Sequence, residues 1–245
     1  MKVDLNCDLG EGMKNDALLI PLISSANIAC GVHAGDESTM KQTIEWCLQH
    51  GVAIGAHPSW PDREQFGRRE MHLPEQQLFD CITEQIHRLQ MIAASFNTRL
   101  RHVKPHGALY NQSAREEWIA ATIAQAVKAV DPSLILFGLS GSGSITAAAQ
   151  LGLRTANEVF ADRTYQDDGT LTSRSQPGSL VEEETAAAAQ VVQMICNHQV
   201  TTVTGKRIPI KADTVCIHGD GAHAFSFCKN IVSTLTQLNI RIEAL

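Results

Sequence analysis

Short apolar runs alternate along the chain with longer segments in which apolar residues recur every three or four positions. The short runs occupy residues 3–7, 26–30, 52–56, 102–104, 134–137, 153–156 and 214–217. They lack a clean alternation of polar and apolar residues, which is typical of strands that are covered on both faces, as in a parallel sheet. The pattern therefore predicts about seven strands, each followed by a helix or a loop.

Four of the longer segments have the periodicity of amphipathic helices. Asp36 can cap a helix that stops at Gly51, and Pro74 opens the longest helix. Residues 116–130 and 182–196 show a similar pattern. Strands that alternate with helices imply right-handed crossovers and a parallel sheet, either open or closed into a barrel. The chain is therefore predicted to be an α/β protein.

The chain contains no linker rich in proline, glycine and serine, so we expect a single domain over residues 1–245. Two stretches, 58–73 and 160–180, are longer than plain connections between elements. Long loops in compact domains are usually functional or mobile.

Composition narrows the range of functions. The 245 residues include 20 Lys+Arg and 26 Asp+Glu, a formal net charge of −6 with no basic block, which argues against nucleic acid as a partner. Asp4 and Asp8 interrupt the N-terminal apolar run, and no run approaches the ~20 residues of a membrane span. The seven cysteines form no C-x-x-C pair, which favours reduced core cysteines and a cytoplasmic location.

Ionisable and hydroxyl residues follow the predicted strands, beside glycines or a proline. In a parallel barrel the carboxyl ends of all strands meet on one face, where active sites are built. Four of the ten histidines lie at four different strand ends, which indicates a shared polar pocket. The ionisable candidates for this pocket are Asp8, Glu11, His33, His57, Lys104, His106, Glu158, Asp162, Arg163, His218 and Asp220.

Individual candidates have more than one interpretation. A single histidine after a strand can be structural, and Asp8 and Glu11 could cap a turn, hold a metal or act as a base. Lys104 lies at the end of a predicted buried strand, so it needs an anionic partner or a substrate. A metal could use Asp8 with His57 and His106, although no H-E-x-x-H pattern demands one.

The Gly/Ser loop at residues 138–144 resembles an anion-binding turn before a helix, with Ser140 and Ser142 as candidate contacts. A plain helix-capping loop explains it equally well. The loop misses G-x-S-x-G at its last residue, and G-x-x-x-x-G-K-[ST] is absent from the chain. The sequence thus argues against a hydrolase nucleophile elbow and a P-loop ATPase.

Several longer blocks resemble the LamB/YcsF family, the A subunit of prokaryotic 5-oxoprolinase. These blocks are VDLNCDLGE at 3–11, ANIACGVHAGD at 26–36, GAHP at 55–58, GRR at 67–69, VKPHGALYN at 103–111, EVFADR at 158–163 and CIHGD at 216–220. They lie in order over nearly the whole chain. The departure that we note is Cys7, where family members often carry alanine.

The resemblance implies a distorted, seven-stranded TIM-like (β/α) barrel of the glycoside hydrolase/deacetylase type. It also implies ATP-dependent opening of 5-oxo-L-proline to L-glutamate, in a complex with separate B and C subunits. The partners would phosphorylate the amide oxygen with ATP, and this chain would hydrolyse the activated intermediate.

Site roles follow from this resemblance as hypotheses. Asp8, His57 or His106 would activate water, Lys104 and the Gly/Ser loop would stabilise developing negative charge, and Arg163 would hold the substrate carboxylate. The remaining catalytic candidates are His33, Glu158, His218 and Asp220, and the remaining substrate-binding candidates are Glu11, Asp162, Ser140 and Ser142. Two other functions stay open, a stand-alone metal-dependent amide or deacetyl hydrolase and a non-catalytic subunit that presents the lactam.

Overall fold

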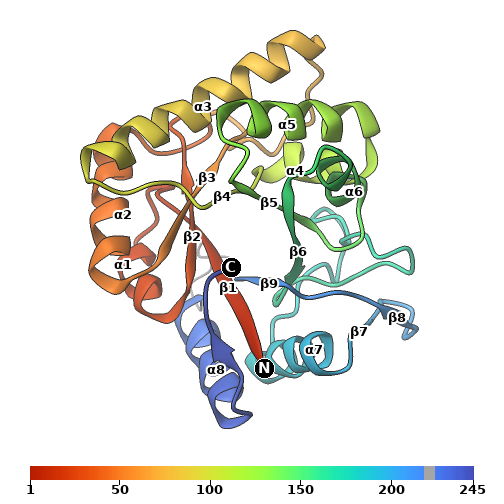
Figure 1. Ribbon diagram of the computed structural model, residues 1–245. Coiled ribbons are helices and arrows are strands. Elements are labelled where there is room, and N and C mark those ends of the chain that lie inside the picture. Colours follow the sequence, from red (N-terminus) through yellow and green to blue (C-terminus); the bar gives the residue numbers. More distant parts are fainter. Residues whose placement is uncertain (218–223) are drawn as a thin grey trace.

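Seven parallel strands close into a barrel in the computed structural model, which describes residues 1–217 and 224–245 (Figure 1). The strands are β1 (Lys2–Leu9), β2 (Ser25–Ala29), β3 (Ala53–His57), β4 (His102–Val103), β5 (Ile135–Leu139), β6 (Arg154–Phe160) and β9 (Thr214–Ile217). Neighbouring strands pair in this order, and β9 pairs with both β6 and β1. The prediction of a TIM-like α/β barrel is therefore confirmed.

Helices surround the barrel on its outer side (Figure 1). They are α1 (Asp16–Leu19), η1 (Ile20–Leu22), α2 (Glu37–His50), α3 (Glu75–Ser95), α4 (Gly107–Arg115), α5 (Glu117–Val130), α6 (Gly143–Gln150), α7 (Glu184–Cys196) and α8 (Ala224–Gln237). As predicted, the Asp36 carboxylate accepts a hydrogen bond from the Thr39 N–H, and Gly51 ends α2 with a φ of 68°. No helix within residues 1–217 and 224–245 is long and apolar enough to cross a membrane.

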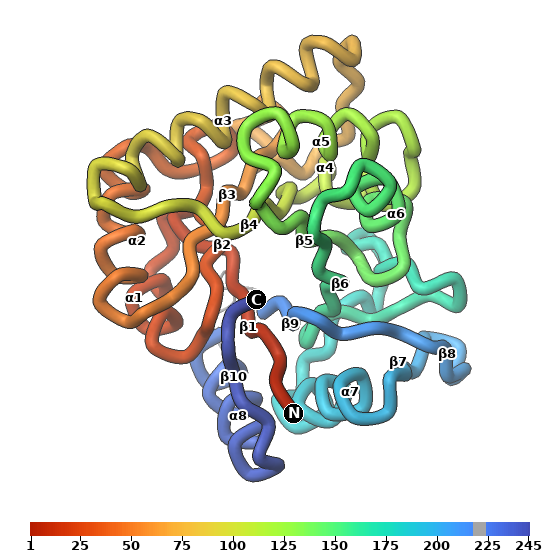
Figure 2. The backbone as a smooth tube through the Cα atoms, viewed as in Figure 1, coloured from red at the N-terminus to blue at the C-terminus, as the bar shows by residue number. Residues whose placement is uncertain are grey.

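Three short strands have no counterpart in the predicted elements. β7 (Gln199–Thr201) and β8 (Arg207–Pro209) form an antiparallel hairpin outside the barrel, and β10 (Arg241–Ile242) pairs with the first residues of β1. Figure 2 shows β10 running alongside β1. Residues 199–201, 207–209 and 241–242 carry no apolar run like those that mark the barrel strands, so the sequence does not predict them.

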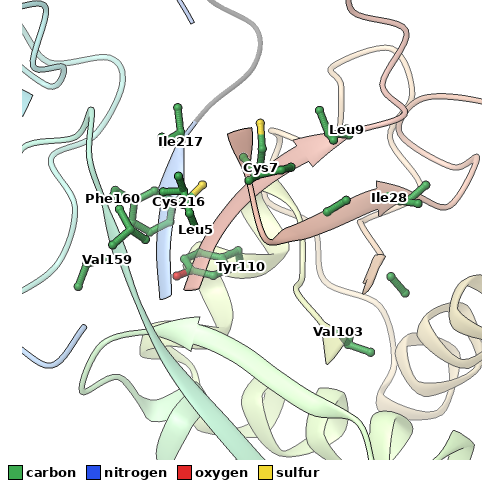
Figure 3. Close-up of a cluster of buried hydrophobic side chains, with 14 of the residues drawn as sticks. Leu5, Cys7, Leu9, Ile28, Val103, Tyr110, Val159, Phe160, Cys216 and Ile217 are labelled. Carbon is green, nitrogen blue, oxygen red and sulfur yellow. The ribbon is translucent and has the colours of Figure 1, made fainter. Parts of the chain in front are cut away.

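Side chains of β1 alternate between two environments. Leu5, Cys7 and Leu9 are buried among apolar side chains, as Figure 3 shows, while Asn6 reaches Glu158 of β6 and Asp8 reaches Lys104, directly after β4. Contacts between non-adjacent strands must cross the interior of a closed barrel. The barrel interior is therefore polar. Residues 3–7 do alternate between apolar and polar side chains, contrary to the description from sequence, but β1 is buried on both faces, as predicted.

Candidate active site

A buried lysine joins two carboxylates inside the barrel. Lys104, directly after β4, places its Nζ atom 2.9 Å from Asp8 Oδ1 and 2.8 Å from Glu158 Oε1. Its ammonium also lies 3.2 Å from Asn6 Oδ1 and 3.1 Å from Cys216 Sγ. Burial by itself lowers the pKa of Lys104, but the neighbouring carboxylates outweigh burial and hold the pKa well above its ordinary value. The lysine is therefore charged, and the anionic partner predicted for it is present.

Of the two carboxylates, Asp8 lies closer to solvent. Its side chain is 12% exposed, whereas that of Glu158 is fully buried. Asp8 Oδ1 accepts hydrogen bonds from Lys104 and, at 2.8 Å, from Asn27 Nδ2. Asp8 Oδ2 lies 3.4 Å from His57 Nε2. One carboxylate oxygen is thus held by the barrel interior, and the other lies beside the histidines.

Three histidines from different elements meet above this network. His57 is the last residue of β3, His106 precedes α4, and His33 lies in the loop after β2; all three are buried. The rings of His33 and His106 stack with centroids 3.9 Å apart, and His106 Nδ1 lies 2.9 Å from His57 Nε2. Three of the four strand-end histidines therefore converge, while His218 and Asp220 lie outside the described residues.

Backbone carbonyls select the tautomers of two of these rings. His57 Nδ1 lies 2.7 Å from the Lys104 oxygen, and His106 Nε2 lies 2.9 Å from the Phe66 oxygen. Carbonyl oxygens only accept, so both of these nitrogens carry hydrogen, and His57 Nε2 and His106 Nδ1 turn toward each other. Their 2.9 Å separation requires a proton or another cation between the two lone pairs.

The charges around the rings place that proton on His57. Burial lowers the pKa of His57, but the Asp8 carboxylate outweighs burial and raises the pKa above its ordinary value. Burial and the charge of His57 hold the pKa of His106 well below its ordinary value. Protonated His57 therefore donates from Nε2 to neutral His106.

The same cluster has the donor atoms of a metal site. One ligand atom from each of Glu11, His33, His57 and His106 lies within 4.8 Å of the other three. Glu11 Oε1 is 3.1 Å from His33 Nε2, 3.3 Å from His106 Nδ1 and 3.8 Å from His57 Nε2. Tetrahedral zinc, with bonds of roughly 2.0–2.1 Å, separates its ligand atoms by about 3.3 Å. This donor set therefore fits a divalent metal.

The set differs from the predicted combination of Asp8, His57 and His106. Glu11 and His33 belong to the cluster, whereas Asp8 lies beside it because Lys104 and Asn27 hold its Oδ1 atom. Glu11 follows β1; the sequence makes it a substrate-binding candidate that, like Asp8, could also hold a metal or act as a base. Only the fold brings its carboxylate to the three rings.

The other predicted site residues have different surroundings. Arg163 is buried and donates to the backbone oxygens of Thr172 and Ser179. The Ser140 hydroxyl accepts from the Lys211 N–H. Ser142 precedes α6 without a side-chain capping bond, and Asp162, which is partly buried, follows β6. The predicted contacts of these residues with a substrate stay predictions.

Several residues of the site were not predicted from sequence. Asn6, Asn27 and His102 belong to the network inside the barrel, where His102 Nε2 lies 2.7 Å from Asn27 Oδ1. A polar residue within an apolar strand is a signal that could have identified Asn6 and Asn27. Phe66, which contacts two of the histidines, has no such signal because it lies in a loop.

Comparisons with known proteins agree with the family resemblance and with the barrel fold. The family model described as the LamB/YcsF family matches residues 3–245. The crystal structure of the lactam utilization protein from Thermus thermophilus is 38% identical, with a TM-score of 0.95 and full coverage of both chains. A family 4 carbohydrate esterase from Streptomyces lividans is 13% identical, with a TM-score of 0.51 over 98% of this chain and 91% of the esterase. The esterase shares the fold alone.

Proposed function

This chain belongs to the LamB/YcsF family, and from that premise we propose that it hydrolyses the amide bond of a small lactam, 5-oxo-L-proline, to L-glutamate. The observation that carries the proposal is the polar centre at one end of the barrel, where Asp8 lies 3.4 Å from His57 in a cluster of three buried imidazoles. The similarity to a lactam utilization protein supports a lactam as the substrate.

Opening the lactam adds one water across the ring C–N bond. The water oxygen bonds to the carbonyl carbon, the C–N bond breaks, and the ring nitrogen gains a proton. A base must remove a proton from the water, and Asp8 is the best-placed candidate because its partly exposed carboxylate places Oδ2 beside the histidine cluster, 3.4 Å from His57 Nε2. Protonated His57, 3.4 Å from that oxygen, is placed to return a proton to the leaving nitrogen.

Lys104 has a supporting part in this proposal. Its ammonium is committed to Asp8, Glu158 and Asn6, so it orients the Asp8 carboxylate. This position favours an internal role over the direct contact with an oxyanion that the resemblance implies. Glu158 likewise acts through Lys104.

A divalent metal held by Glu11, His33, His57 and His106 would polarise the lactam carbonyl as a Lewis acid. Two backbone carbonyls already orient His57 and His106, as outer partners orient metal-binding histidines. A metal would take the place of the proton between these two rings, so His57 would return a proton to the leaving nitrogen only in the metal-free centre and would otherwise be a ligand.

The finer part of the proposal concerns ATP and partners. A five-membered lactam is a stable amide, so its hydrolysis benefits from coupling to ATP. Because the chain lacks G-x-x-x-x-G-K-[ST], we assign ATP use to the complex with the separate B and C subunits. A second candidate, a stand-alone metal-dependent amide hydrolase, is favoured by the Glu/His donor set.

Glutamate release from 5-oxoproline tests these alternatives. The purified chain is assayed with and without ATP, with and without zinc, and with and without the two partner subunits, and the Asp8→Asn variant serves as the matched control. We expect release only when ATP, the partners and unmodified Asp8 are all present. Release by the chain and zinc alone would support the second candidate, and release by the partners without this chain would contradict both.

A further inference from the structure

Phe66 adopts a backbone conformation that is costly for its residue type. It lies in the 58–73 loop with a φ of 55°, in the left-handed region, and Gly67 follows with a φ of 65°. Bulky side chains rarely occupy this region, and strained residues cluster at functional sites. The contacts of Phe66 show what its conformation achieves.

Both parts of Phe66 contact the histidine cluster. Its carbonyl oxygen accepts a hydrogen bond from His106 Nε2 at 2.9 Å. Its ring stands nearly perpendicular to the stacked rings, with centroids 5.5 Å from His33 and 5.3 Å from His106. On the ring itself lies the Arg68 guanidinium, 5.0 Å from the centroid.

The surrounding backbone prevents the loop from relaxing. The Gly67 N–H donates to the Asp62 oxygen at 2.7 Å, and the Ala108 N–H donates to the Gly67 oxygen at 2.9 Å. A Cβ atom on Gly67 would come within 3.0 Å of His106 Cδ2, and one on Gly107 within 2.6 Å of the Gly67 oxygen. The loop therefore packs directly against His106 and the start of α4.

We propose that Phe66 is a positioning residue, whose left-handed backbone directs its carbonyl at His106 Nε2 and whose ring holds His33 parallel to His106. The carbonyl selects the Nε2–H tautomer, so His106 Nδ1 faces Glu11 and His57. The effect of Phe66 on metal affinity rests on the proposed function. Its effect on the tautomer of His106 stands independently of that function.

Three substitutions separate the backbone from the ring. Phe66→Tyr keeps both, Phe66→Gly tolerates the left-handed backbone but removes the ring, and Phe66→Val removes the ring and disfavours the backbone. Asn97→Val is the matched control, because Asn97 also has a φ of 55° but lies just beyond the end of α3. This control separates general strain from an effect on the site.

Nitrogen-15 NMR of the histidine side chains in the metal-free protein reports the tautomer. We expect the Nε2–H form of His106 in the unmodified protein, in Phe66→Tyr, in Phe66→Gly and in Asn97→Val. Phe66→Val should populate the Nδ1–H form. Loss of the ring in Phe66→Gly should shift the His33 resonances.

Competition with a chromogenic chelator measures zinc affinity. Loss of a residue that holds a metal-binding histidine in place typically weakens metal affinity by about 10–100-fold. We expect zinc affinity to fall by this amount in Phe66→Val and by about tenfold in Phe66→Gly. Phe66→Tyr and Asn97→Val should stay within about twofold of the unmodified protein.

The outcomes discriminate the two proposals. An unchanged His106 tautomer in folded Phe66→Val would overturn the inference. If Phe66→Val does not fold, unchanged His33 resonances and zinc affinity in Phe66→Gly would overturn it. An unmodified protein that binds no zinc would contradict the metal centre, while the NMR result would still decide the role of Phe66.

Discussion

At the scale of single residues, buried charge organises the interior of the barrel. Lys104 is 2% exposed and lies between two carboxylates, Asp8 and Glu158. The amides of Asn6 and Asn27 donate further hydrogen bonds to Glu158 Oε1 and Asp8 Oδ1. Such a network stabilises the fold only while all its members are present, because each unpaired buried charge is expensive.

Replacing Lys104 by methionine should destabilise the protein strongly. It leaves Asp8 and Glu158 without their cation, and breaking a buried ion pair costs about 3–5 kcal/mol. Urea unfolding measures the loss, and the exposed Lys128→Met is the control. Adding Glu158→Gln to Lys104→Met should recover part of the stability. If Lys104→Met alone were as stable as the unmodified protein, the buried ion pairs of Lys104 would not stabilise the fold.

His106→Ala should remove most glutamate formation in the reconstituted complex. His106 lies 2.9 Å from His57 and 3.3 Å from Glu11, at the centre of the cluster. Its loss removes the acceptor of the His57 proton and a ligand of the proposed metal. We therefore expect turnover to fall about 10²–10⁴-fold, as when acid–base catalysis is disabled, or about 3–5 kcal/mol of barrier. Circular dichroism checks that the variant folds, and exposed His87→Ala is the control. Near-normal turnover by folded His106→Ala would refute this role.

His102 should make stability depend on pH. Burial, together with the nearby charges of Lys104 and His57, lowers its pKa from 6.5 to about 3. Between these values the unfolded chain binds a proton that the folded chain does not, so the free energy of unfolding falls as pH falls. The contribution is about 1.4 kcal/mol per pH unit.

Urea unfolding between pH 6 and pH 4 measures this slope. His102→Gln retains a donor for Asn27 but does not titrate, so its stability should depend less steeply on pH. Equal slopes for the two proteins would show that His102 titrates normally in the folded state.

At the scale of elements, each strand carries two different faces. Successive residues of a strand point to opposite sides, so β1 supplies apolar side chains to the core and polar ones to the barrel interior. Neighbouring strands must then leave room for each other's interior side chains. Gly55 of β3 pairs with His102 of β4, whose ring stacks on Phe137 with centroids 4.2 Å apart.

Gly55→Ala should therefore damage the barrel. A Cβ atom at this position would lie 2.1 Å from His102 Nε2, and the ring cannot move because Phe137 and Asn27 hold it. We expect a loss of at least about 1–3 kcal/mol in chemical unfolding, as for other overpacked cores.

Gly152→Ala is the matched control for this substitution. Gly152 has a φ of 78° and no atom within 4 Å of an added Cβ, so only backbone strain of about 1–2 kcal/mol opposes the change. If Gly55→Ala were no more destabilising than this control, the steric argument would be wrong.

At the scale of the whole molecule, closure of the barrel creates the site. Because β9 pairs with both β6 and β1, the first and last strands of the barrel are neighbours. Asp8 of β1 and Glu158 of β6 therefore reach the same lysine across the interior. An open sheet would separate these two carboxylates.

The purified chain alone is expected not to hydrolyse ATP. It lacks a P-loop pattern, and the proposed reaction assigns ATP to the complex with its partners. ADP release is measured with and without 5-oxoproline. Stoichiometric, oxoproline-dependent ADP release by a preparation free of the partner subunits would refute this expectation.

Much of the fold follows from local patterns in the sequence. The seven barrel strands are predicted from short apolar runs, four of the helices from apolar periodicity, and the ends of α2 from Asp36 and Gly51. Periodicity and capping act over a few neighbouring residues, so they can be recognised without knowing the fold. The positions of His33, His57 and His106 at strand ends follow from the same patterns.

Tertiary structure alone decided how these residues combine. Lys104 meets a carboxylate 96 positions away, Glu11 rather than Asp8 joins the histidines, and Phe66 contacts them from a loop without a regular pattern. These contacts depend on closure of the barrel and on loop packing, which involve residues far apart in the chain. A residue type shows that a charge needs a partner, but only the folded chain determines which partner comes within hydrogen-bonding distance.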